Sequence, residues 1–114
     1  MSTISGGVLA GSTDGKPINI TATSSPGTTI HQAGASGFDE LWIYCYNSDW
    51  SADHYLYVLW GGVTGGDTIK YKIEAGKEKL VIQGPKRISG AILVAAYADV
   101  AGVLYCTGGF NRIS

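Results

Sequence analysis

Short stretches of alternating polar and apolar residues recur along this chain, and turn-forming residues separate them at intervals of about 8 to 12 positions. A β-strand directs successive side chains to opposite faces, so such alternation predicts strands with one buried face. No stretch shows a convincing helical period. The pattern therefore predicts an all-β fold, an antiparallel β-sandwich resembling a jelly roll, with about seven or eight strands. The expected strands are residues 17–23, 27–33, 40–47, 54–60, 67–73, 80–83, 91–97 and 103–110.

The chain of 114 residues is long enough for one domain with a core of its own. Residues 1–15 are rich in Gly, Ser and Thr and show little periodicity, which predicts a flexible N-terminal arm outside the core. Residues 16–114 are then expected to form a single β-sandwich domain. Within it, the segment GPKRISG at residues 84–90 combines glycine, proline and charged side chains, and this composition predicts a loop.

The charge balance argues against several classes of partner. Eight Lys and Arg residues stand against nine Asp and Glu residues, so the chain has no basic excess for binding nucleic acid or an anionic membrane. Charged residues make up only 15% of the chain, against about 25% in typical domains. The surface is therefore expected to be uncharged polar or covered by a partner. The N-terminus carries neither a basic region nor a long apolar run, which predicts a soluble protein made in a cytoplasm.

The two cysteines, Cys45 and Cys106, lie within apolar stretches and lack the spacing of a metal site or a redox motif. Cysteines in such positions are usually buried, so free thiols inside the core are expected. A disulfide is the alternative if their strands are neighbours, although a reducing compartment would keep it open.

Few residues could carry catalysis or hold a cofactor. Asp53 and His54 are adjacent, but neighbours on a strand point to opposite faces and cannot easily act as a dyad. His31 has no second ligand at a metal-binding spacing. The glycine pairs of WGGVTGGD, residues 60–67, precede neither a Lys-Ser/Thr pair nor a helix, so a hairpin turn is favoured over a phosphate-binding loop. The sequence thus predicts no enzyme, no cofactor and no metal site.

Aromatic residues form the most distinctive cluster of the sequence. Trp42, Tyr44 and Tyr46 fall on one face of the strand expected at 40–47, and Cys45 falls on the other with a leucine and an isoleucine. A sheet in a sandwich needs only one apolar face, so the second apolar face needs an explanation. A second layer of the same domain, a neighbouring subunit or a bound glycan would each explain it. A subunit contact is preferred because Tyr and Trp are enriched at protein interfaces, with the aromatic side outward, although alternation leaves the opposite register open.

Four more residues join the candidate interface. Trp50 stands alone in the polar loop between two expected strands, and Trp60 ends the strand at 54–60. Lys86 and Arg87 lie in the expected loop, either as solvated charges or as contacts to carboxylates of a partner. The candidate interface thus comprises Trp42, Tyr44, Tyr46, Trp50, Trp60, Lys86 and Arg87.

The order of several segments resembles a group of small virion proteins of tailed bacteriophages. A TTIH segment precedes the aromatic stretch DELWIYCYN, an NSD loop and a WGG turn follow, and the chain closes on GGFNRIS. The resemblance covers about residues 17 to 113. It implies a non-enzymatic structural protein of the virion, made in the cytoplasm of the host bacterium. The role it implies is that of a capsid decoration or cement protein that stabilises the assembled head as a homotrimer, with the major capsid protein or other virion proteins as partners.

The alternative is a neck or tail structural protein, or a host-receptor module that binds carbohydrate. In that case Trp50 with the neighbouring Asn47, Asp49 and Asp53 would form a site at the rim of the domain. Two positions depart from the pattern of the resemblance. Cys45 stands where an ordinary apolar residue is expected, and Trp50 occupies a loop position expected to be exposed.

Overall fold

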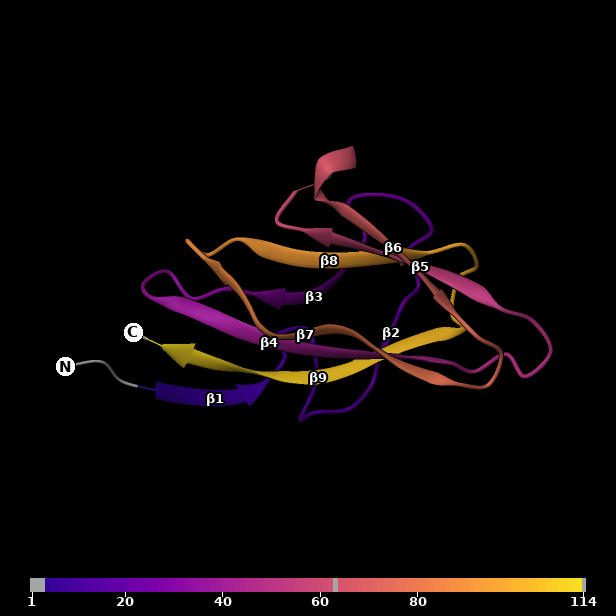
Figure 1. Ribbon diagram of the computed structural model, residues 1–114, viewed down its shortest axis with the longest axis horizontal. Helices are drawn as coiled ribbons and strands as arrows, with labels where there is room; N and C mark the ends of the chain where they lie inside the picture. The colour runs from indigo at the N-terminus through magenta and orange to yellow at the C-terminus, as the bar shows by residue number, and fades with distance from the viewer. Residues whose placement is uncertain (1–3, 63, 114) are drawn as a thin grey trace.

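The computed structural model describes residues 4–62 and 64–113, which fold as two antiparallel β-sheets packed against each other (Figure 1). This arrangement confirms the antiparallel β-sandwich predicted by the alternating pattern. The described residues contain nine strands, against the seven or eight expected, and one short 3-10 helix. The elements are β1 (Ile4–Val8), β2 (Ile18–Asn19), β3 (Thr28–Gln32), β4 (Phe38–Asn47), β5 (His54–Trp60), η1 (Gly65–Asp67), β6 (Thr68–Ile73), β7 (Glu78–Ser89), β8 (Leu93–Ala98) and β9 (Leu104–Ile113).

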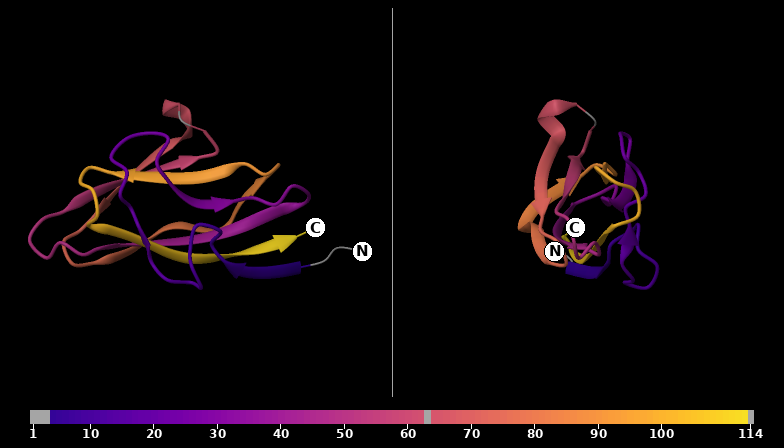
Figure 2. Two further views of the ribbon diagram at one scale, coloured as in Figure 1. Left: turned by 180° about the vertical axis from the view of Figure 1, so that it is seen from behind. Right: turned by 90° about the vertical axis from the view of Figure 1, so that its right-hand side faces the viewer.

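Each sheet combines strands that are far apart in the sequence. The first sheet has the order β1-β9-β4-β7, and β2 also pairs with β9, on the part of β9 that β1 does not reach. The second sheet has the order β3-β8-β5-β6. Because β1 and β9 are antiparallel with Ile4 opposite Ile113, the two ends of the described chain lie side by side (Figures 1 and 2).

The core lies between the two sheets. Leu41, Ile43 and Cys45 of β4 point into it and are at most 1% exposed. From the second sheet, Leu56 and Val58 of β5 are buried to the same degree. Burying a large aliphatic side chain stabilises a fold by about 1.5–3 kcal/mol. This interior layer therefore supplies the main driving force for packing the two sheets together.

A buried charged cluster connects the N-terminal segment to both sheets. Asp39 of β4 is fully buried and accepts hydrogen bonds from Arg112 of β9 at 2.8 and 3.0 Å and from Nε2 of His31 at 2.7 Å. Nδ1 of His31 accepts a hydrogen bond from the Ala10 N–H at 2.9 Å, so the neutral ring carries its proton on Nε2. Burial raises the pKa of Asp39, but the hydrogen bonds from Arg112 and His31 outweigh it and lower the pKa below the ordinary 3.8.

The N-terminal segment, which was expected to be a flexible arm outside the core, is part of the fold. Residues 4 to 8 form β1 at the edge of the first sheet, and Leu9 is fully buried. Gly6 allows this close pairing, because a Cβ there would lie 2.9 Å from the side-chain oxygen of Asn111. An edge strand of this kind depends on backbone pairing, so its sequence lacks the apolar alternation that reveals other strands. Residues 1 to 3 of the expected arm lie outside the described residues.

Residues 84–90 are not the loop that their composition predicts, because β7 continues through them to Ser89. Leu41 of β4 pairs with Lys86, whereas Ile43, two positions further on, pairs with Ile82. β7 therefore carries extra residues opposite β4 and bulges. Such a bulge in an edge strand accommodates the glycine and proline of this segment, which a central strand would not tolerate.

Candidate interaction surface

The outer side of β4 carries the aromatic residues that the sequence singles out. Because the alternate residues of β4 fill the core, Trp42, Tyr44 and Tyr46 lie on the outer side of the first sheet. Tyr44 is 37% exposed, and the other two are half-buried. Of the two registers left open by the sequence, the structure has the preferred one, with Cys45 inside and the aromatic rings outside.

β9 extends this surface with an aromatic residue that the sequence analysis did not include. Tyr105 lies directly opposite Tyr46 in the β4–β9 pair. Further along, a Cβ on Gly108 would lie 1.9 Å from the carbonyl oxygen of Trp42, so only glycine allows the two strands to approach as they do. We call Trp42, Tyr44, Tyr46 and Tyr105 the aromatic face.

A shallow hollow of about 580 Å³ adjoins the aromatic face. Tyr46 and Tyr105 contribute to its lining, together with Pro17 and two residues of opposite charge, Lys16 and Glu78. Apolar rings bordered by isolated charges resemble the centre and rim of a protein–protein contact. The surface thus combines apolar rings with charged residues at its margin.

The structure brings one of the two basic candidates to the aromatic face and separates the other from it. Nε of Arg87 donates to Glu40 at 3.1 Å, and its guanidinium lies 4.6 Å from the ring centroid of Phe38, on the same side of β4 as the aromatic face. Lys86 points away, with its Nζ 5.2 Å from the ring of Trp60. Trp60 itself packs against the core, so neither Lys86 nor Trp60 belongs to the aromatic face.

Trp50 lies apart from the aromatic face, in the loop between β4 and β5. Its side chain is 78% exposed and rests on Gly76, where a Cβ would come within 2.8 Å of the indole ring. The polar residues expected to complete a carbohydrate site beside it are engaged elsewhere. Asn47 is fully buried and donates to two backbone carbonyl groups, and Asp53 accepts a hydrogen bond from a backbone N–H at 2.9 Å.

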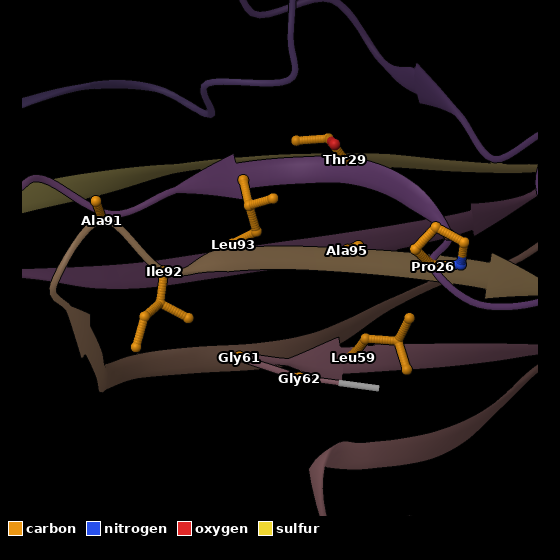
Figure 3. A pocket seen from close by; sticks show the side chains of 10 residues that line it. Pro26, Thr29, Leu59, Gly61, Gly62, Ala91, Ile92, Leu93 and Ala95 are labelled. Atoms are coloured by element: carbon orange, nitrogen blue, oxygen red, sulfur yellow. The ribbon is translucent and has the colours of Figure 1, made fainter. Parts of the chain in front are cut away.

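The outer side of the second sheet holds aromatic residues that the sequence analysis did not single out. Tyr57 of β5 and Tyr97 of β8 stack with their ring centroids 4.7 Å apart, and Nζ of Lys70 lies 5.7 Å from the Tyr57 ring. An apolar hollow of about 580 Å³ opens on the same sheet, with Leu59 of β5 and Leu93 of β8 in its lining (Figure 3). Tyr57 is thus engaged with both Tyr97 and Lys70.

His54 contacts two carboxylates that the sequence analysis did not connect with it. Its Nε2 lies 2.8 Å from Asp49 Oδ2, and its Nδ1 lies 3.2 Å from both carboxylate oxygens of Asp99. The adjacent Asp53 contacts Lys72 at 3.4 Å instead. Since both ring nitrogens of His54 are occupied, neither is free to act as a general base on a substrate.

The two cysteines are free thiols buried opposite each other, Cys45 on β4 and Cys106 on β9. A hydrogen bond with Cys45, together with burial, raises the pKa of Cys106 well above the ordinary 9.0. A thiol of this kind is a poor nucleophile. Residues 4–62 and 64–113 contain no group of three or more His, Cys, Asp or Glu side chains that could hold a metal ion. In that same part of the chain, no helix is long and apolar enough to span a membrane.

No protein-family model, curated protein or solved structure matches this chain.

Proposed function

We propose that this chain is a non-enzymatic structural protein of a tailed-bacteriophage virion, and that it is a capsid decoration or cement protein. In this role it binds the outside of the assembled head as a homotrimer, with the major capsid protein and its own copies as partners. The order of segments over residues 17 to 113 supports the virion role. The observation that carries the binding role is the aromatic face on the outer side of the first sheet.

The aromatic face has the properties of a contact surface. Trp42, Tyr44 and Tyr46 occupy three successive outward positions of one strand, so a partner meets a row of rings held by a sheet rather than by a loop. Tyr and Trp offer large contact areas at low entropic cost because few of their bonds rotate. With charged residues at only 15% of the chain, little charge needs to be desolvated on contact.

The mechanism of a cement protein follows from mass action. A protein that binds the assembled shell and not its dissociated parts stabilises the shell by its free energy of binding. Three copies joined in a trimer raise the overall affinity further, because the second and third contacts form within one complex. No chemical step is needed.

The mass of the purified protein in solution, with and without purified phage shells, tests this proposal. Light scattering is expected to give the mass of a trimer, and the trimer is expected to co-sediment with the shells. A monomer that stays in the supernatant would contradict the proposal.

Substitutions on the two outer faces locate the contact. Trp42→Ala and Tyr44→Ala are expected to give folded protein that is monomeric and no longer co-sediments, because truncating a central aromatic anchor weakens an interface by about 2 kcal/mol or more. Tyr57→Ala removes a ring from the second sheet and is the matched control, which should keep the mass and the binding of the unaltered protein. Equal losses in all three variants would argue against the aromatic face as the contact.

A receptor-binding role at the neck or tail is the second candidate, and the 78% exposure of the Trp50 side chain favours it. An indole ring held in a loop can stack on a sugar ring. Binding to a glycan array that is lost in Trp50→Ala and kept in Trp42→Ala would support this role. Absence of glycan binding, together with co-sedimentation of Trp50→Ala with shells, would exclude it in favour of the first proposal.

A further inference from the structure

The end of the sandwich opposite the chain termini contains a histidine between two carboxylates. His54 begins β5 and lies between the connection of residues 48–53, which carries Asp49, and the connection of residues 99–103, which carries Asp99. Its side chain is 9% exposed, whereas those of Asp49 and Asp99 are 28% and 32% exposed. The ring therefore joins two surface connections from a largely buried position.

The contacts determine the protonation state of the ring. A neutral imidazole has one N–H donor and one acceptor nitrogen, whereas an imidazolium has two N–H donors. At His54 both nitrogens face carboxylates, at 2.8 Å on the Asp49 side and 3.2 Å on the Asp99 side. A neutral ring would direct a lone pair at one carboxylate and lose that hydrogen bond. Only the imidazolium satisfies both contacts.

We propose that His54 is a proton-operated clamp. As an imidazolium, it holds the connections 48–53 and 99–103 together, and as a neutral ring it keeps Asp49 and releases Asp99. Asp99 is the one released because its contact with the ring is longer. The structural consequence is local. Asp99 Oδ1 also accepts a hydrogen bond from the Tyr55 N–H at 3.2 Å. When the ring releases the carboxylate of Asp99, this second hydrogen bond is lost as well. This clamp does not depend on the proposed function.

The surrounding charges favour the closed form of the clamp. Hydrogen bonding to Asp49 raises the pKa of His54 above the ordinary 6.5; burial opposes this, and Asp99 adds to the increase. The hydrogen bond between His54 and Asp49 is also the main cause that lowers the pKa of Asp49 below 3.8. Asp53 and Lys72, the neighbouring charged pair, contact each other. The clamp is therefore closed when His54 is protonated, and it opens as the pH rises through the raised pKa of His54.

The effect of the clamp is confined to the side chain of Asp99, because backbone hydrogen bonds hold both connections. Asp49 anchors the connection that carries Trp50, through its carboxylate on His54 and its carbonyl oxygen, which accepts the Gly76 N–H at 3.0 Å. In the other connection, the Asp99 N–H donates to the Tyr55 carbonyl oxygen at 3.2 Å, and the Gly102 N–H donates to the Ile20 carbonyl oxygen at 2.9 Å. Neutralisation of His54 therefore releases the side chain of Asp99 from the ring, while the backbone of both connections stays in place.

NMR titration of the full chain tests the clamp, since the sequence contains only two histidines. The ¹⁵N shifts of the His54 ring are expected to show an imidazolium with a midpoint above 6.5, and both Asp49→Asn and Asp99→Asn are expected to lower that midpoint. Asp53→Asn removes the same charge from the adjacent residue and is the matched control, which should leave the midpoint much less changed. A midpoint at or below 6.5, or an equal decrease in Asp53→Asn, would overturn the proposal.

Hydrogen exchange tests the release of Asp99. Exchange rates are first corrected for their intrinsic dependence on pH. The amide of Tyr55 is then expected to lose protection above the His54 midpoint, while the amide of Ser51, which donates to Asp49 Oδ1 at 2.9 Å, keeps it. Protection at Tyr55 that does not change across the midpoint, or that is lost at Ser51 instead, would contradict the assignment of Asp99 as the released group.

Discussion

Neighbouring residues of β4 have opposite roles, and this contrast is the basis of the candidate surface. Ile43 is 1% exposed in the core, and Tyr44, the next residue, is 37% exposed on the aromatic face. Their difference is one of position and not of hydrophobicity, since both side chains are large and largely apolar. Stability measurements can therefore separate the two sides of the strand.

We expect Ile43→Ala to lower the free energy of unfolding by about 2–5 kcal/mol, because it removes buried methyl and methylene groups and leaves a cavity. Tyr44→Ala is the matched control on the opposite side and should change the free energy of unfolding of the monomer by less than about 1 kcal/mol. Chemical denaturation of both variants, at a concentration where the protein is monomeric, measures the difference. A larger loss for Tyr44→Ala would place the rings in the core.

A second residue-scale prediction concerns the contact between β9 and β4. Gly108→Ala would bring a Cβ to 1.9 Å from the Trp42 carbonyl oxygen, so the two strands must move apart. Overpacking of this kind costs about 1–3 kcal/mol or more. Gly65→Ala is the control, because a Cβ there has no neighbouring atom within 4 Å. Thermal denaturation should show a lower midpoint for Gly108→Ala only, and similar midpoints would show that the strands tolerate the change.

At the scale of elements, β1 converts a segment with little periodicity into the edge of a sheet. Residues 5 to 8 are exposed, so backbone pairing with β9 and the buried Leu9 that follows hold the segment in place. Covering the edge of β9 also limits its pairing with other chains, since an unpaired edge strand is a template for aggregation.

We expect Leu9→Ala to destabilise the protein by about 2–5 kcal/mol, because Leu9 is fully buried within the core cluster. Val8→Ala is the matched control, since Val8 is 45% exposed. Urea denaturation measures both. If Leu9→Ala has no larger effect than Val8→Ala, the N-terminal segment is an arm, as its composition suggests, and not a part of the sheet.

At the scale of the whole molecule, two charged clusters act at opposite ends of the sandwich and respond to pH in different ranges. The cluster of Asp39, Arg112 and His31 lies near the chain termini, and the clamp of His54 lies at the other end. The first depends on an ionised carboxylate and the second on a protonated imidazole. Stability is therefore expected to decrease in acid through the first and at higher pH through the second.

At low pH, the stability of the protein is expected to depend on Asp39. Because the folded protein lowers the pKa of Asp39 below 3.8, its contribution to stability is complete above that value and is lost as the pH falls through the lowered pKa. Asp39→Asn is therefore expected to be less stable at pH 6 and to lose less stability on acidification. Urea midpoints measured from pH 6 to pH 2.5 test this, with Asp14→Asn as a control at an exposed residue. Parallel acid profiles for Asp39→Asn and the unaltered protein would contradict it.

Alternation along the chain was enough to predict the fold class and the grouping of side chains along each strand, because the two-residue period of a β-strand is a local property. It therefore grouped Trp42, Tyr44 and Tyr46 correctly on one face, and the alternation of Leu104, Tyr105 and Cys106 held the signal for the fourth ring. Period alone could not decide which face is inside, because that depends on the sheet packed opposite.

Contacts between distant segments could not be predicted and are seen only in the folded protein. Asp99 reaches His54 from 45 positions away, and Arg112 reaches Asp39 from 73 positions away, so no local pattern marks either pair. The strand in residues 84–89 and β1 were hidden for a related reason. Glycine and proline argue locally for loops, whereas pairing at the edge of a sheet, through a bulge in β7 and a close backbone approach in β1, accommodates them as strands.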